Sequence, residues 1–174
     1  PSFSMIRVLR LSHRPERDKR LSTHVALVAR AFGADEIVYT GVRDPEMEES
    51  VRKVVKNWGG NFKISYSDNW KQVVKGFPGK IVHLTMYGLP VDEVIPKLRG
   101  ENLLIIVGGE KVPPQFYQLS DYNVAVGSQP HSEAAALAIC LDRYYQGKPF
   151  KRQEGNLTIT PSERGKLVKV KKCK

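Results

Sequence analysis

Cysteine is scarce in the 174-residue sequence, which contains only Cys140 and Cys173 and no Cys-x-x-Cys pair. This excludes a disulfide framework and a paired-cysteine metal site, and it favours a reducing, cytoplasmic setting. Long apolar runs are missing too, since none approaches the roughly 20 residues of a membrane-spanning helix. The segment from Phe3 to Leu11 is short and broken by arginines, so we expect neither a membrane protein nor a secretory signal.

Two common nucleotide-binding motifs are also absent. No Gly-x-Gly-x-x-Gly follows the first apolar run, and no Gly-x-x-x-x-Gly-Lys-[Ser/Thr] occurs anywhere in the chain. The sequence therefore supports neither a dinucleotide-binding domain nor a P-loop NTPase.

Acidic residues are outnumbered by basic ones, 18 against 28, which gives a formal net charge of +10. The excess lies at the ends, because residues 1–20 carry a net charge of +4 and residues 148–174 carry +7, whereas the residues between them are close to neutral. A near-neutral body with two basic ends predicts a polyanionic partner such as nucleic acid. The alternative is a lysine tail that only aids solubility.

Short apolar runs alternate with amphipathic stretches through most of the chain. The apolar runs predict strands at Met5–Leu11, Ile37–Thr40, Phe62–Ser65, Lys80–Thr85, Leu103–Val107 and Tyr122–Val126. The helix signals are a Ser22 or Thr23 cap after a polar loop at Ser12–Arg20, and further helix starts at Asp44-Pro45, Asp68, Pro90 and Pro130. This alternation predicts an α/β fold, with one parallel sheet covered by helices on both faces.

The pattern changes after Gly147. Apolar and polar residues alternate on either side of the turn segment 161–165, which predicts a lysine-rich β-hairpin. We therefore expect one domain at 5–147 and a basic β-hairpin extension at 148–174.

The last helix, expected from Pro130 to Gln146, is apolar on nearly every side between Ala134 and Leu141. Such a helix must be covered all round, and its alanines allow another helix to approach closely. Part of this helix is therefore predicted to form a two-fold homodimer interface.

Two neighbouring strands end in glycine: Leu103–Val107 runs into Gly108-Gly109-Glu110, and Tyr122–Val126 runs into Gly127-Ser128. Ligands of open α/β sheets bind beyond the carboxyl ends of the strands, so these loops predict a cofactor pocket. The loops offer backbone amides, hydroxyls and the amide of Gln129, with Lys111 as their only lysine, which suits adenosine and an amino-acid tail better than a triphosphate. Two ordinary strand-to-helix turns that use glycine for positive φ are the alternative.

The segments VGGEKVP and VGSQPHSEAAALAI resemble the second and third motifs of SPOUT RNA methyltransferases. The opening RLSHRPERDKRLSTHVALVARAFGA resembles one branch of that superfamily, the archaeal tRNA (cytidine-56) 2′-O-methyltransferases. The resemblance implies a carboxyl-terminal trefoil knot, a homodimer, S-adenosylmethionine as cofactor, and tRNA as the substrate that is methylated on a ribose 2′-hydroxyl. It requires no metal.

The resemblance also places cofactor contacts, mostly through backbone atoms, on three loops. They are Leu84; Gly108, Gly109, Glu110, Lys111 and Val112; and Val126, Gly127, Ser128, Gln129, Pro130, His131, Ser132 and Glu133.

Two positions depart from the wider superfamily. Leu27 stands where many relatives have the catalytic arginine, and Pro130 stands where they have asparagine. Arg20 is therefore our candidate for the catalytic arginine. Because guanidinium holds its proton strongly, either His24 or His131 is an alternative proton acceptor.

Basic residues near both ends are the candidates for RNA binding. They are Arg14, Arg17, Lys166, Lys169 and Lys171. The rival readings are a SPOUT enzyme that acts on another tRNA or rRNA nucleotide, and a catalytically silent RNA-binding module. A flavodoxin-like signalling domain is disfavoured, because the first strand ends in a basic segment.

Overall fold

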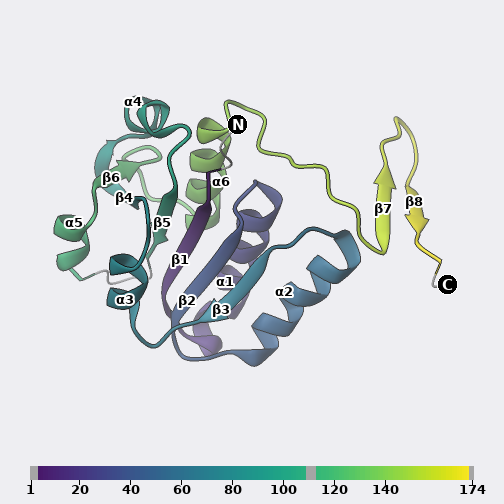
Figure 1. Cartoon of the computed structure of the whole chain (residues 1–174), viewed down its shortest axis with the longest axis horizontal. Helices are drawn as coiled ribbons and strands as arrows, with labels where there is room; N and C mark the ends of the chain where they lie inside the picture. The colour runs from purple at the N-terminus through teal and green to yellow at the C-terminus, as the bar shows by residue number, and fades with distance from the viewer. Residues whose placement is uncertain (1–3, 109–112, 173–174) are drawn as a thin grey trace.

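A computed structural model of the chain describes residues 4–108 and 113–172. Its body is a six-stranded parallel sheet of order β3-β2-β1-β5-β4-β6, followed by a separate antiparallel pair, β7-β8 (Figure 1). The strands are β1 (Ile6–His13), β2 (Glu36–Gly41), β3 (Lys63–Tyr66), β4 (Lys80–Pro90), β5 (Leu103–Val107), β6 (Tyr122–Ala125), β7 (Leu157–Thr160) and β8 (Leu167–Val170). The helices are α1 (Pro15–Ala31), α2 (Pro45–Trp58), α3 (Trp70–Lys75), α4 (Val91–Val94), the 3₁₀ helix η1 (Ile95–Leu98), α5 (Gln115–Leu119) and α6 (Glu133–Tyr144).

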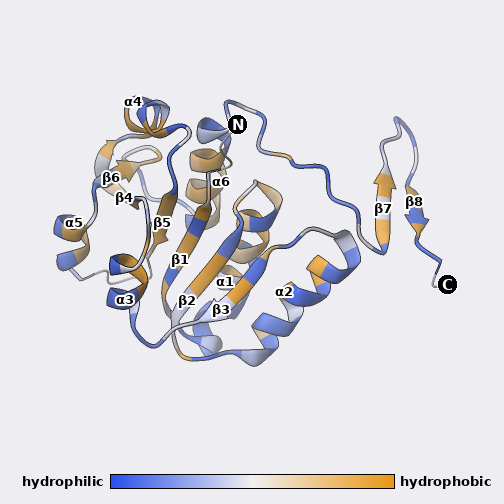
Figure 2. Cartoon of the chain, in the orientation of Figure 1, coloured by the Kyte–Doolittle hydropathy of each residue, from blue (hydrophilic) through white to orange (hydrophobic). Residues whose placement is uncertain are grey.

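Helices cover both faces of the parallel sheet, which confirms the predicted architecture. On one face, Ile6 and Val8 of β1 pack with α1, α2, α4, η1 and α6. On the other face, Leu9 and Leu11 pack with α3 and α5. All five residues of the central strand β5 are buried, as expected for a strand covered on both sides (Figure 2). The trefoil knot implied by the resemblance stays a prediction.

The predicted polar loop at Ser12–Arg20 is wrong. Strand β1 continues to His13, and α1 begins at Pro15. Proline suits the first helical position because its missing N–H would have no partner there, and acidic residues in the first turn favour the positive end of the helix dipole. Ser22 is consequently not a helix cap but a buried residue inside α1.

Strand β4 continues to Pro90 rather than ending at Thr85, and three other helix boundaries differ from the sequence prediction. Asn69, not Asp68, caps α3, because its side chain accepts a hydrogen bond from the N–H of Gln72 at 3.3 Å. The helix expected after Pro90 divides into α4 and η1, since Pro96 lacks the N–H that would continue an α-helical ladder. The last helix is shorter than the predicted span and begins at Glu133, and α5 was not predicted.

The segment 148–156, which leads to the hairpin, is attached to the body. The ring of Phe150 lies 5.3 Å from that of Phe32 at the end of α1. The backbones of Gly59 and Gly155 approach so closely that a Cβ atom on Gly155 would lie 2.4 Å from the nitrogen of Gly59. These contacts fix where the hairpin starts, while the domain boundary at residue 147 stays a prediction.

The predicted β-hairpin is present, and its two faces differ. Cross-strand pairing puts apolar side chains on one face: Leu157 with Val170, and Ile159 with Val168. The other face carries Thr158 with Lys169, and Thr160 with Leu167. The hairpin projects away from the parallel sheet in Figure 1, and its lysines are open to solvent.

Within the described part of the chain, no helix is long and apolar enough to cross a membrane. The same residues contain no group of three or more His, Cys, Asp or Glu side chains that could hold a metal ion. Cys140 lies fully buried on α6, where burial raises the pKa of its thiol to about 12. The thiol is therefore protonated and unreactive at neutral pH.

Candidate active site

A wide bulge interrupts the pairing of β4 with β6. Leu84 and Leu89 of β4 both pair with Val124 of β6, so residues 85–88 are left out of the ladder. Gly88 closes the bulge, and a Cβ atom there would lie 2.4 Å from both the carbonyl oxygen of Asn123 and the nitrogen of Val124. Glycine thus allows β4 to return to the sheet after the bulge.

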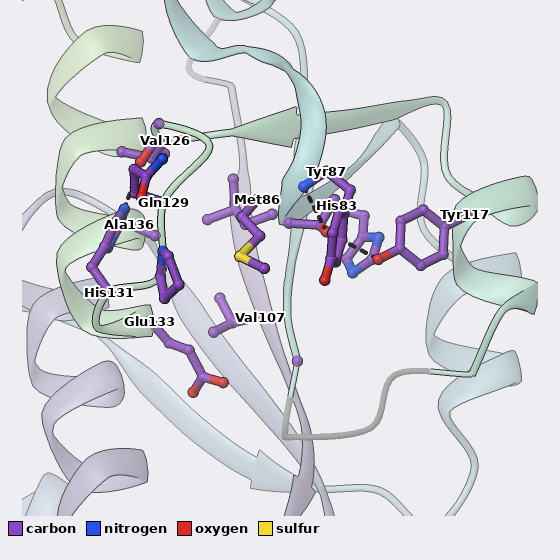
Figure 3. Close-up of a pocket in the computed structure, with 15 residues that line it drawn as sticks. His83, Met86, Tyr87, Val107, Tyr117, Val126, Gln129, His131, Glu133 and Ala136 are labelled. Carbon is purple, nitrogen blue, oxygen red and sulfur yellow. Dashed lines mark hydrogen bonds between the residues drawn. The ribbon is translucent and has the colours of Figure 1, made fainter.

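The bulge forms one wall of a cavity of about 570 Å³ at the carboxyl ends of β4, β5 and β6. Its lining residues are His83, Leu84, Thr85, Met86, Tyr87, Val107, Gly108, Tyr117, Val126, Gly127, Gln129, Pro130, His131, Glu133 and Ala136. Figure 3 shows His131 and Glu133 on one side, His83 and Tyr117 on the other, and Val107 between them. A concave cleft of this size, with apolar side chains and several polar groups in its lining, is typical of small-molecule sites.

Most of the predicted cofactor contacts that the structure describes line this cavity. They are Leu84, Gly108, Val126, Gly127, Gln129, Pro130, His131 and Glu133. Ser128 and Ser132 belong to the same loop but are not lining residues, and Gly109, Glu110, Lys111 and Val112 lie outside the described residues.

Sequence reasoning missed several lining residues, among them His83, Tyr87 and Tyr117. The signal for the bulge was the Met86-Tyr87-Gly88 segment, which resembles the two later glycine loops. No sequence signal marked Tyr117, because it lies on the unpredicted helix α5.

His83 is buried, and its protonation can be read from its neighbours. The side-chain N–H of Asn123 donates to the backbone oxygen of Tyr117 at 2.9 Å, so the amide oxygen of Asn123 faces Nδ1 of His83 at 2.9 Å. Nδ1 therefore carries the proton, and Nε2 is an acceptor. Burial lowers the pKa of His83, which keeps the ring neutral.

His131 has a structural role in the loop between β6 and α6. Its Nε2 faces the carbonyl oxygen of Val126, and its Nδ1 lies 3.1 Å from the carbonyl oxygen of Ser132. Both ring nitrogens thus face hydrogen-bond acceptors. This arrangement disfavours His131 as the acceptor of a substrate proton.

Apart from His131, the candidate catalytic and RNA-binding residues are not among the residues that line the cavity. Arg20 and His24 are exposed on α1, and neither is a lining residue. Arg17 is held by Asp18 through two hydrogen bonds of 2.7 and 3.0 Å, which makes it less available to a phosphate. Arg14 is the amino-terminal capping residue of α1. The exposed lysines 166, 169 and 171 belong to the hairpin segment.

Replacing Gly88 with alanine is expected to lower the affinity for a ligand of the cavity by about tenfold or more, because overpacking here costs about 1–3 kcal/mol and displaces the bulge. The measurement is calorimetric titration with S-adenosylmethionine. Gly165→Ala in the hairpin turn is the matched control, since the nearest atom there would lie 3.7 Å away. Unchanged affinity of the Gly88 variant would show that the bulge does not shape the binding site.

Known proteins resemble this chain over most of its length. The sequence profile of the family described as tRNA ribose 2′-O-methyltransferase, aTrm56, matches residues 58–169. The tRNA (cytidine(56)-2′-O)-methyltransferase of Pyrococcus horikoshii is 57% identical over 171 residues, which cover 94% of this chain and 84% of the relative. The enzyme of the same name from Methanopyrus kandleri is 55% identical over 167 residues, which cover 92% and 94%.

Two solved structures share the fold at low sequence identity. The TrmH/SpoU tRNA modifying enzyme of A. aeolicus superposes with a TM-score of 0.65 and 15% identity, covering 84% of this chain and 76% of that one. The SpoU methyltransferase AviRb from Streptomyces viridochromogenes, in complex with AdoMet, gives a TM-score of 0.63 and 19% identity, covering 87% and 61%.

Proposed function

Because the chain belongs to the tRNA ribose 2′-O-methyltransferase (aTrm56) family, we propose that it methylates the ribose 2′-hydroxyl of cytidine 56 in tRNA, with S-adenosylmethionine as the methyl donor. The observation that carries the proposal is the match to the Pyrococcus horikoshii enzyme, which is 57% identical over 94% of this chain. The family profile matches residues 58–169, which include the lining residues of the pocket and most of the hairpin. A tRNA substrate also supports the expected cytoplasmic location.

The cavity beyond β4, β5 and β6 suits the donor. Apolar walls such as Leu84, Val107 and Val126 fit an adenine ring, and the backbone of the glycine-ended loops is available to its polar edge. Glu133, whose side chain is 31% exposed, brings a carboxylate to the lining for a donor that carries positive charge. We expect the loops at 108–112 and 126–133 to hold the donor chiefly through backbone atoms.

The reaction needs little covalent chemistry from the protein. When bound, the donor supplies an electrophilic methyl group on a positively charged sulfur, and methyl transfer leaves neutral S-adenosylhomocysteine. The protein must place the 2′-oxygen in line with that methyl carbon, while the hydroxyl proton passes to a base. A guanidinium group is not an ordinary base, so the expected role of Arg20 is to position the phosphate next to the reacting ribose.

The basic ends of the chain support tRNA as the partner. Lys166, Lys169 and Lys171 lie on an exposed hairpin whose starting point is fixed by the segment 148–156. Phosphate contacts from such lysines supply affinity without reading the sequence, which suits a substrate recognised by its overall shape. Arg14 at the start of α1 is a second candidate contact.

We also propose that the protein is a homodimer. The single chain leaves apolar side chains uncovered beside the pocket, with Tyr87 76% and Leu89 62% exposed. Ile139 of α6 is 38% exposed, so this helix is not covered all round in one copy. A second copy packed on α6 would cover it, and sedimentation analysis would measure the mass.

Incubation with unmodified tRNA and isotope-labelled donor, followed by mass mapping of the methylated nucleotide, tests the function. The expected product carries one 2′-O-methyl group at cytidine 56. A methyl group on another tRNA or rRNA nucleotide would establish a different substrate for the same chemistry. Binding of tRNA with no affinity for the donor would instead identify a silent RNA-binding module.

A further inference from the structure

An arginine is buried inside the apolar layer between the sheet and its helices. Arg10 lies on β1, on the same face as Ile6 and Val8, and is 1% exposed. Removing a charge from water costs several kcal/mol unless partners replace the lost hydration. The partners of Arg10 therefore indicate what the residue is for.

The guanidinium of Arg10 connects three elements. Its Nη1 donates to the carbonyl oxygen of Gly108, which directly follows β5, and lies 2.9 Å from Oε2 of Glu133, the first residue of α6. Its Nε donates to Oγ of Ser22 in α1 at 3.3 Å. Gly108 and Glu133 both line the pocket. One buried cation therefore links the end of β5, the start of α6 and helix α1.

The contact between Arg10 and Glu133 is an attraction between charges without the alignment of a hydrogen bond. Oε2 of Glu133 is buried and has no aligned hydrogen-bond donor among the described residues, although Arg10 is 2.9 Å away. Burial raises the pKa of Glu133, and the positive charge of Arg10 opposes that effect. Burial likewise lowers the pKa of Arg10, and the negative charges of Glu133 and Asp18 oppose that effect.

A chain of hydrogen bonds supports Arg10 from the other side. Oγ of Ser22 lies 2.7 Å from Nδ1 of His13, and Nε2 of His13 lies 2.9 Å from a carboxylate oxygen of Asp44. Since carboxylate only accepts, Nε2 of His13 carries a proton. In the tautomer with the proton on Nε2, Nδ1 accepts from the Ser22 hydroxyl, which leaves Oγ to accept from Arg10. Nε of Arg10, the Ser22 hydroxyl and Nε2 of His13 then each have an acceptor, and together with the bond from Nη1 to Gly108 this chain orients the guanidinium.

We propose that Arg10 is a positioning residue for the methyl donor. Arg10 holds the backbone of Gly108 and the carboxylate of Glu133 in the geometry that binds S-adenosylmethionine. The inference rests on the proposed function, because it assigns the donor to this pocket. Arg10 itself is not a lining residue, so it acts through Gly108 and Glu133. None of these contacts of Arg10 involves the hairpin that is proposed to bind RNA.

Two variants separate this role from a contribution to folding. Arg10→Lys keeps the charge but cannot reach all three partners with one planar group. Arg10→Met/Glu133→Leu replaces the buried pair with apolar side chains, a change that is often neutral or stabilising for a fold. Arg7→Met is the matched control, because Arg7 lies on the same strand and pairs with Glu36 at 2.6 Å, away from the pocket.

The double variant is expected to melt within a few degrees of the wild-type protein, whereas Arg10→Lys should melt at a lower temperature because it leaves buried polar groups unpaired. Both variants should bind S-adenosylmethionine about tenfold or more weakly in a calorimetric titration. Their affinity for tRNA, measured without donor, should stay within about twofold, and the Arg7 variant should match the wild type in both. Wild-type donor affinity in the folded double variant would overturn the proposal, as would an equal loss of tRNA and donor affinity. Failure of the wild-type protein to bind the donor would instead refute the proposed function.

Discussion

Replacing Arg20 with alanine is expected to reduce methyl transfer to tRNA by about two to three orders of magnitude, the usual cost of removing one well-placed polar contact from a transition state. Affinity for S-adenosylmethionine should be unchanged, because Arg20 does not line the pocket. Its side chain is exposed on α1, so the substitution should cost little stability. The measurements are single-turnover methyl transfer and, separately, a calorimetric donor titration.

Two further variants make the result for Arg20 interpretable. Arg20→Lys keeps the charge but loses the forked geometry that contacts a phosphate in two places, so we expect partial activity. Arg52→Ala removes another exposed arginine, on α2, whose side chain is 56% exposed, and should leave turnover unchanged. Near-normal turnover of the Arg20→Ala variant would remove Arg20 from the mechanism and leave the exposed His24 as the next candidate for a role in the reaction.

Changing Lys166, Lys169 and Lys171 together to glutamine should weaken tRNA binding roughly tenfold or more at physiological salt. Each replaced lysine that had bound a phosphate should also reduce the steepness of the slope of log affinity against log salt concentration by about 0.9. Donor affinity should not change, because the hairpin and the pocket share no residues. Filter binding across a salt series measures both effects.

The control for the lysine variant must carry the same change of charge. Lys53, Lys75 and Lys97 are exposed on α2, α3 and η1, and their joint replacement by glutamine removes three charges elsewhere. An equal loss of affinity in both triple variants would mean that only net charge matters. Point substitution is preferable to truncation after Phe150, since truncation would also remove the packing of Gly155 on Gly59.

Sequence periodicity predicted the order of strands and helices in the body well, because an apolar run or an amphipathic stretch carries its own signal. Strand β5 is an example, as its predicted and observed bounds agree. The start of α1 was placed too late, because the charged residues before Ser22 look like a loop when their partners are unknown. In the structure, Asp18 is buried and bonded to Arg17.

The pocket was predictable in place but not in shape. Two glycine-ended runs at one edge of a parallel sheet imply a crevice. The expectation that these two strands are neighbours was wrong, because β4 lies between β5 and β6. The bulge at 85–88 depends on Leu84 and Leu89 sharing one partner in β6, and no local pattern encodes that register. The role of Arg10 was equally unpredictable, since an arginine in a strand is expected to be exposed unless its partners are known.

Local signals in the sequence were sufficient to predict the parallel α/β sheet, the pocket at the carboxyl ends of its strands and the basic extension, because each depends on local periodicity, turn residues or charge. The burial of Arg10 and its contacts with Gly108, Glu133 and Ser22 are visible only in the folded chain. The reason is that burial and hydrogen bonding depend on residues as far apart as β1 and α6, which meet only after the chain has folded.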